Sequence, residues 1–235
     1  MVYRRLDVTL GAFPEVSRIY RKADDYFADV HCMLKLPHKD IGNAGCNFSS
    51  LLVLCSVIDG VSNLIYPTKR IQPDKGDGKR FKKLLRDYFM RHWQKSYNTD
   101  VGKFAKKLYV EFRNPLVHQL AHSGLNQRAM DNSEPIVGKW GNIPEDKRDL
   151  DNLENLTVAE WPKDWFAFQD SDRNSGPDKV CLVALYWWTK QMMEILSHES
   201  DVLRGAEALL AMNPENEPTT SWWDSLRGAI DRLLT

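Results

Sequence analysis

The sequence lacks the features that would place the chain in a membrane, in a disulfide framework or in a common phosphate-binding enzyme class. No uninterrupted apolar run reaches the ~20 residues of a membrane-spanning helix, and two arginines near the start replace an apolar secretory core. The four cysteines include no CxxC pair. No P-loop, GxGxxG or GxSxG motif occurs. We therefore expect a protein of the reducing cytoplasm that needs no cofactor.

The chain also lacks a net charge, because 32 lysine and arginine residues balance 32 acidic residues. A protein that coats nucleic acid nonspecifically is usually strongly basic, so this class is disfavoured. Apolar residues make up 43% of the chain, and eight tryptophans supply bulky material for a core or an interface. A length of 235 residues suits one large domain, which we place over residues 1–235.

Apolar residues recur at helical spacing from about 14 to 122 and again over 180–212. The spacing predicts a first helix over 14–36 and a second from an N-cap at Asn47 to about Tyr66. This second helix is apolar nearly all round, which is typical of a central, buried helix. A short basic helix and a fourth helix are expected before residue 122.

The segment 124–178 breaks this pattern, since Gly, Pro, Asn and Asp are frequent in it. Its apolar pieces at 136–140 and 165–168 predict a small β-hairpin or an irregular insertion. A last amphipathic helix is expected over 220–234. The fold class we predict is therefore mainly α, an antiparallel helical bundle with an irregular or small β-hairpin insertion around 124–178.

The segment from Arg113 to His118 reads Arg-Asn-Pro-Leu-Val-His and lies within a helical pattern. Pro115 removes a backbone donor and clashes one turn back, at a cost of ~3 kcal/mol in an ordinary helix interior. That cost indicates a helix boundary or a kink that serves a purpose. Asn114 and His118 are one helical turn apart and share a face, which His122 extends.

These residue types suit the cleavage of RNA without a metal. The ribose 2′-hydroxyl must lose a proton, the departing 5′-oxygen must gain one, and phosphate charge must be stabilised. Histidine can serve either proton role near neutral pH, and arginine presents paired donors to phosphate. One chain supplies one histidine and one arginine in this segment, so a two-fold homodimer is a physical expectation of this interpretation.

The segment resembles the R-x4-to-6-H signature of HEPN domains, in which the residue after the arginine is usually polar and often asparagine. An acidic residue in the apolar second helix, here Asp59, is a further similarity. The likeness covers roughly residues 10–125 and, less clearly, 180–212. It implies a metal-independent endoribonuclease of a toxin–antitoxin or phage-defence system, with an antitoxin protein as a partner. Other members have lost catalysis and bind a nucleotide or a partner protein, which is the alternative for this chain.

By this resemblance Arg113 and His118 are catalytic, Asn114 and His122 support them, and Asp59 orients Arg113. Each also has a structural explanation, as a helix-end arginine paired to an acid, a satisfied core histidine or a hydrogen-bonded core acid. His118 and His122 could bind a metal ion from one helix face, but no HExxH pattern completes such a site. We therefore expect no metal site. A purely structural assembly domain is a third alternative.

A run of basic residues precedes the segment. Such a run is usually a solvated helix face, but it could steer RNA towards the segment. The candidate steering residues are Lys79, Arg80, Lys82, Lys83 and Arg86. The tryptophan pairs 187–188 and 222–223 are expected in the core or a dimer interface, and the histidines at 31, 38, 92 and 198 are expected to be incidental.

Overall fold

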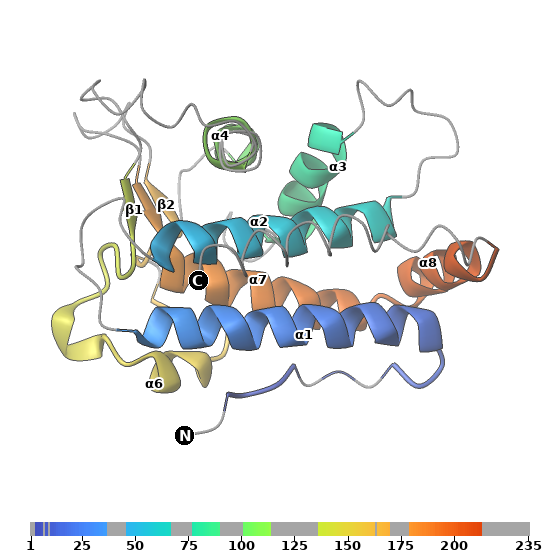
Figure 1. Cartoon of the computed structure of the whole chain (residues 1–235), viewed down its shortest axis with the longest axis horizontal. Coiled ribbons are helices and arrows are strands. Elements are labelled where there is room, and N and C mark those ends of the chain that lie inside the picture. Colours follow the sequence, from blue (N-terminus) through green and yellow to red (C-terminus); the bar gives the residue numbers. More distant parts are fainter. Residues whose placement is uncertain are drawn as a thin grey trace, which may run out of the picture.

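The computed structural model describes residues 3–6, 8, 10–36, 46–66, 77–89, 101–113, 136–162, 164–169 and 179–212. This part of the chain is mostly helical, with one small mixed sheet. Three long helices lie side by side along the long axis of the molecule, and the first runs antiparallel to the other two (Figure 1). They are α1 (Pro14–Lys35), α2 (Cys46–Ile65) and α7 (Leu182–Ser197).

The predicted first helix is confirmed as α1, and its start is stabilised from a distant part of the chain. Pro14 occupies the first turn, where its missing N–H costs nothing. Phe13 precedes the helix and offers no capping side chain. Instead the Glu207 carboxylate of α8 (Ser200–Met212) accepts hydrogen bonds from the backbone N–H groups of Glu15 and Val16, at 3.1 and 2.9 Å. This contact ties α8 to α1.

The second helix, α2, forms the buried centre and packs against α1, α3 and α7. It begins at Cys46, so Asn47, expected as its N-cap, lies inside the first turn. Among the described helices it alone has the length and mean hydropathy of a membrane span, which a search for unbroken apolar runs missed. Most of it is covered by the rest of the bundle, which is compatible with a soluble protein.

Two shorter helices lie over α2 and carry the residues that precede the Arg113 segment. They are α3 (Asp77–Leu84), which widens into the π-helical turn η2 (Leu85–Phe89), and α4 (Val101–Lys107), which widens into η3 (Leu108–Arg113). In Figure 1 α4 is seen end-on, so it crosses the long helices. Pro115, where the sequence predicts a helix boundary or a kink, lies outside the described residues, and the helix already widens from Leu108. Such π-turns are rare and frequently occur at functional sites.

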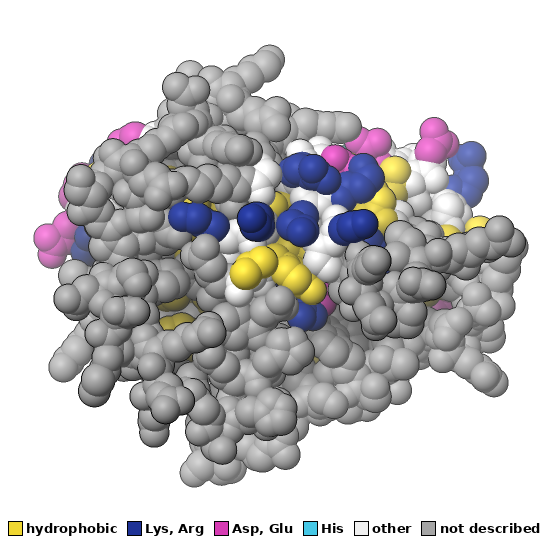
Figure 2. Space-filling view, turned by 90° about the horizontal axis from the view of Figure 1, so that it is seen from above, with side chains coloured by type: hydrophobic (Ala, Val, Ile, Leu, Met, Phe, Trp, Pro, Cys, Tyr) yellow, Lys and Arg dark blue, Asp and Glu magenta, His cyan; other side chains and the backbone are white. Residues whose placement is uncertain are grey.

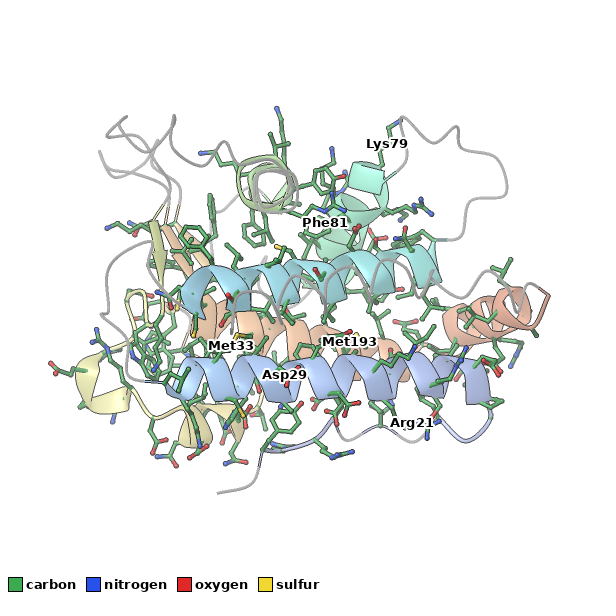
Figure 3. All side chains as sticks on the ribbon, viewed as in Figure 1. Arg21, Asp29, Met33, Lys79, Phe81 and Met193 are labelled. Carbon is green, nitrogen blue, oxygen red and sulfur yellow. The ribbon has the colours of Figure 1, made fainter. Side chains whose placement is uncertain are left out.

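The short basic helix is amphipathic, as its spacing predicted. Phe81 is fully buried between α3 and its neighbours, whereas Lys79 on the same helix points away from the bundle (Figure 3). Leu84, Leu85 and Tyr88 complete the buried stripe. This stripe packs α3 and η2 against α2 and α7, and it leaves the lysine and arginine side chains towards the solvent.

The segment 124–178, expected to form a small β-hairpin or an irregular insertion, supplies two strands of a mixed three-stranded sheet. The strands are β1 (Ile136–Gly138), β2 (Phe168–Gln169) and β3 (Lys179–Cys181), in the order β1-β3-β2. The first predicted apolar piece contains β1 and the second contributes only Phe168 to β2, and these two strands do not pair with each other. Instead β3 pairs in parallel with β1 and antiparallel with β2. Because β3 takes the first residues of the stretch 180–212, α7 begins only at Leu182.

The stretch 180–212 is divided once more, because α7 ends at Ser197 and α8 starts at Ser200. Two further short helices, unpredicted from the sequence, lie in the segment 124–178: η4 (Glu145–Lys147) and α6 (Leu150–Glu154). The Asp149 side chain caps α6 by accepting the backbone N–H of Asp151. The helix predicted over 220–234, with the 222–223 tryptophan pair, lies outside the described residues.

The tryptophans of α7 confirm their predicted place in the core. Trp187 and Trp188 are only 2% and 4% exposed. Trp161, from the segment between the strands, stacks on Trp187 with ring centroids 4.2 Å apart. Aromatic pairs of this kind add to the area that they bury, so they hold the irregular segment against α7.

Candidate functional site

Arg113, the last residue of η3, is the part of the Arg113–His118 segment that the structure describes. Its Nη2 donates a hydrogen bond to Asp59 Oδ2 of α2 over 2.7 Å. The two side chains are 13% and 8% exposed, so water screens their attraction little. The contact expected between Asp59 and Arg113 is therefore present.

The position of Asp59 explains why the pair forms. A carboxylate in an apolar, central helix is costly to bury unless a cation or several donors meet it. The chain folds η3 against α2 and brings Arg113 to Asp59 across 54 residues of sequence. The pair also satisfies both charges, which is the structural role that the sequence left open for these residues.

The electrostatics of the pair keep the arginine charged. Burial lowers the pKa of Arg113, but the charge of Asp59 and its hydrogen bond outweigh burial and raise the pKa above its ordinary value. Cys55, one turn before Asp59, is fully buried, and burial raises the pKa of its thiol to about 12 although Arg113 opposes the change. At neutral pH Cys55 is therefore a protonated thiol that acts as a small apolar side chain.

Tyr109 lies against the other side of this arginine. The Arg113 guanidinium carbon is 5.2 Å from the centre of the Tyr109 ring, within the range of a cation–π contact. The Tyr109 ring in turn meets Phe81 of α3, with centroids 5.3 Å apart. Arg113 is thus held by a carboxylate and an aromatic ring, and the sequence predicted only the carboxylate.

The basic residues of 77–89 and 101–113 include a group before Arg113 that we term the basic face: Lys79, Arg80, Lys82, Lys83, Arg86, Lys106 and Lys107. These two segments contain nine basic residues and three acidic residues, in a chain whose net charge is zero. Figure 2 shows lysine and arginine side chains in a row across this side of the molecule, with apolar side chains next to them. One apolar side chain of η3, Val110, is 47% exposed.

The five predicted steering residues all belong to the basic face, and α3 and η2, which carry them, pack against α4 and η3. Lys79, Lys83 and Arg86 are exposed, while Arg80 and Lys82 are half-buried. Lys83 already pairs with Asp87, whose other partner is the Tyr66 hydroxyl at 2.6 Å. Lys83 therefore attracts an incoming anion less strongly than an exposed lysine without a counterion.

Three predicted site residues, Asn114, His118 and His122, lie outside the described residues. Of the residues expected at the site, the structure therefore describes Arg113, Asp59 and the five candidate steering residues. Within the described ranges, no three His, Cys, Asp or Glu side chains gather in an arrangement that could hold a metal ion.

A second polar cluster, which the sequence did not predict, is buried between α1, α6 and α7. We term it the buried cluster: His31, Glu154, Tyr186 and Lys190. Glu154 Oε1 accepts hydrogen bonds from the Tyr186 hydroxyl, from Lys190 Nζ at 3.4 Å and from His31 Nδ1 at 3.0 Å. His31, for which no functional role was expected, is 4% exposed and takes part in these contacts.

The buried cluster joins distant parts of the chain. Lys190 also donates to the backbone oxygen of Arg4 at 2.8 Å, and Asp151 of α6 lies 3.5 Å from His31 Nε2. Burial raises the pKa of Glu154, but its hydrogen bonds and the Lys190 charge lower it overall. These acidic residues of the segment 124–178 pair with α1 and α7 and not with the basic face. A lysine inside an apolar helix was the signal in the sequence.

The arrangement around Arg113 can orient a guanidinium beside a cationic surface, and the buried cluster can fasten the segment between the strands to the bundle. Any function has to be argued from these residues. No family model, curated protein or solved structure matches the chain.

Proposed function

We propose that the chain is a HEPN-like, metal-independent endoribonuclease of antiparallel helical-bundle type, in which Arg113 binds a phosphate of RNA and His118 transfers protons. The observation that carries the proposal is the Arg113–Asp59 pair at the end of a π-helical turn. A guanidinium has five N–H donors in a planar fork, so an arginine oriented by one carboxylate can still bind phosphate oxygens. Asp59 supports catalysis by fixing the direction of that fork.

The reaction needs two proton transfers. A neutral His118 accepts the proton of the ribose 2′-hydroxyl, and the 2′-oxygen forms a bond with phosphorus while the bond from phosphorus to the 5′-oxygen breaks. A protonated histidine donates to the departing oxygen. The products are a 2′,3′-cyclic phosphate and a 5′-hydroxyl. Two copies of the chain about a two-fold axis would supply both histidines, and Asn114 and His122 would support them.

The basic face supports RNA as the substrate. The segments 77–89 and 101–112 contain eight basic and three acidic residues, and this excess of positive charge before Arg113 attracts polyanions through phosphate contacts. We infer a cytoplasmic protein of a toxin–antitoxin or phage-defence system, whose antitoxin protein would cover this surface. Each phosphate contact makes binding more sensitive to salt.

The test is cleavage of mixed RNA by the purified chain in the presence of a chelator. We expect the parent to leave 2′,3′-cyclic phosphate ends and His118→Ala to be slower by ~10²-fold or more. Arg113→Ala should lose a similar factor through phosphate stabilisation. Matched controls are His198→Ala and Arg204→Ala, which change exposed side chains of the same types and should cleave like the parent. Equal rates for His118→Ala and the parent would refute the proposal.

One observation favours a second function, a catalytically inactive HEPN-like module that binds a nucleotide or a partner protein. Asp59 already balances the charge of Arg113, and the arginine side chain is only 13% exposed, which weakens the stabilisation that this arginine can give to a charged transition state. This function predicts no cleavage by the parent at any pH. It also predicts that a fluorescent nucleotide binds the parent and binds Arg113→Ala more weakly.

A further inference from the structure

Tyr109 is half-buried, and its ring packs between two described side chains. It belongs to η3, and its ring contacts Arg113 and Phe81 at the distances given above. Phe81 is fully buried, so this neighbour is itself fixed by the core. An aromatic ring whose neighbours are fixed is a firm surface for a planar guanidinium.

Gly78 of α3 also lies against the Tyr109 ring. A Cβ atom at this position would lie 2.7 Å from Tyr109 Cε1 and 3.0 Å from Tyr109 Cζ, closer than two carbon atoms can approach. Gly78 lies inside α3, where glycine is a poor helix former compared with alanine. It has no positive φ that would require glycine. Its role in α3 is therefore the close approach of Tyr109.

We propose that Tyr109 is a positioning residue whose ring, seated against Gly78 and Phe81, fixes the plane of the Arg113 guanidinium. Asp59 accepts a hydrogen bond from Nη2 of this guanidinium. The Tyr109 face opposes rotation of the guanidinium about that bond. The consequence for RNA cleavage rests on the proposed function, whereas the positioning itself does not.

The positioning can be measured without any activity. An aromatic ring shifts the NMR resonances of protons above its face, so the Nε–Hε resonance of Arg113, assigned through Arg113→Lys, reports the stacking. We expect Tyr109→Leu to return this resonance towards the position of exposed arginines and Tyr109→Phe to preserve it. Unchanged Arg113 resonances in Tyr109→Leu would overturn the proposal.

Gly78→Ala provides a test that leaves both Tyr109 and Arg113 in the chain. The added methyl group should displace the ring and shift the Arg113 resonance in the same direction as Tyr109→Leu. Gly205→Ala is the matched control, because Gly205 lies in the helix α8 and an added Cβ meets nothing within 4 Å. If Gly78→Ala and Gly205→Ala leave the resonance equally unmoved, Gly78 does not seat the ring and the proposal is wrong.

RNA cleavage then separates this proposal from the function on which it depends. Tyr109→Leu and Gly78→Ala should lower kcat by about 10- to 100-fold, since a misplaced phosphate-binding group weakens the transition state, with little change in KM. Tyr109→Phe should restore kcat. Normal kcat in Tyr109→Leu would refute the positioning and leave the ribonuclease standing. No cleavage by the parent would refute the ribonuclease, and the NMR result would still decide the positioning.

Discussion

Replacement of Glu154 by glutamine tests the energetic importance of the buried cluster. Glutamine keeps the size of the side chain and one oxygen acceptor, but it removes the negative charge that faces Lys190. Lys190 is 4% exposed and would remain in the core without this carboxylate, with the backbone oxygen of Arg4 still accepting its hydrogen bond. We expect a large loss of stability at neutral pH, because the remaining charge is poorly solvated and has lost its buried counterion.

The magnitude follows from the burial of the pair. Removing one partner of a buried ion pair costs about 3–5 kcal/mol. For a domain of this size one kcal/mol corresponds to about 2–4 °C in Tm, so Glu154→Gln should lower Tm by roughly 6–20 °C. A second substitution, Lys190→Met in the Gln variant, removes both charges and should recover much of the loss. That recovery would show that the two side chains act as a pair.

The pH dependence has a definite sign. The folded-state pKa of Glu154 is lowered overall, so the unfolded chain binds this proton more tightly than the folded chain does. The stabilisation by Glu154 is therefore complete above the unfolded-state pKa, about 4.3, and is lost as the pH falls through the lower folded-state pKa. In this acidic range the stability of Glu154→Gln should change less with pH than that of the parent.

Urea unfolding followed by tryptophan fluorescence is a suitable assay, since Trp161 and Trp187 are stacked in the core. Glu145→Gln is the control, because Glu145 is an exposed residue of η4 in the same part of the chain. This control should unfold like the parent. If Glu154→Gln unfolds within about 0.5 kcal/mol of Glu145→Gln, the reasoning from the buried charge fails, because changes of that size are typical of the surface.

Three further substitutions test separate contacts. Glu207→Ala should destabilise the protein by about 1 kcal/mol through the loss of the cap on α1, and thermal melting that matches the parent would contradict this capping role. Gly141→Ala should lower the free energy of unfolding by about 1–3 kcal/mol, because Gly141 has φ +55° and a Cβ there would lie 2.6 Å from the Cβ of Cys181. Thermal unfolding followed by circular dichroism measures this loss of stability. Asp59→Asn keeps an acceptor for Arg113 but removes its counterion. The free energy of unfolding should fall by about 3 kcal/mol, and the rate of RNA cleavage should fall as well. An unchanged rate would show that Asp59 supports only the fold.

The helices that could be predicted from the sequence are those whose apolar pattern is visible within the helix itself. The apolar spacing of α1 and the uniformly apolar α2 identify them without knowledge of their neighbours. In contrast, Val180 and Cys181 continue the apolar pattern of α7, and only their pairing with β1 and β2 makes them a strand. That pairing joins segments far apart in the chain, which a periodicity of apolar residues does not reveal.

The same distinction separates the site contacts that were predicted from those that were not. Asp59 is a charged residue in an apolar helix and requires a partner, and the resemblance to HEPN domains indicated Arg113 as that partner. Glu154 is one of many acidic residues in an irregular segment, and nothing in that segment singles it out. The closeness of Gly78 to Tyr109 depends on how two helices pack, and a single sequence carries no measure of that distance.

The Glu207 cap on α1 has a consequence for synthesis of the protein. The backbone donor of Glu15 and the carboxylate that accepts it are 192 residues apart. While the chain emerges from the ribosome, the first turn of α1 has no such acceptor until residue 207 has been translated. A nascent chain cut short before α8 would therefore keep a frayed start to its first helix, and completion of the bundle waits for one of the last described helices to be made.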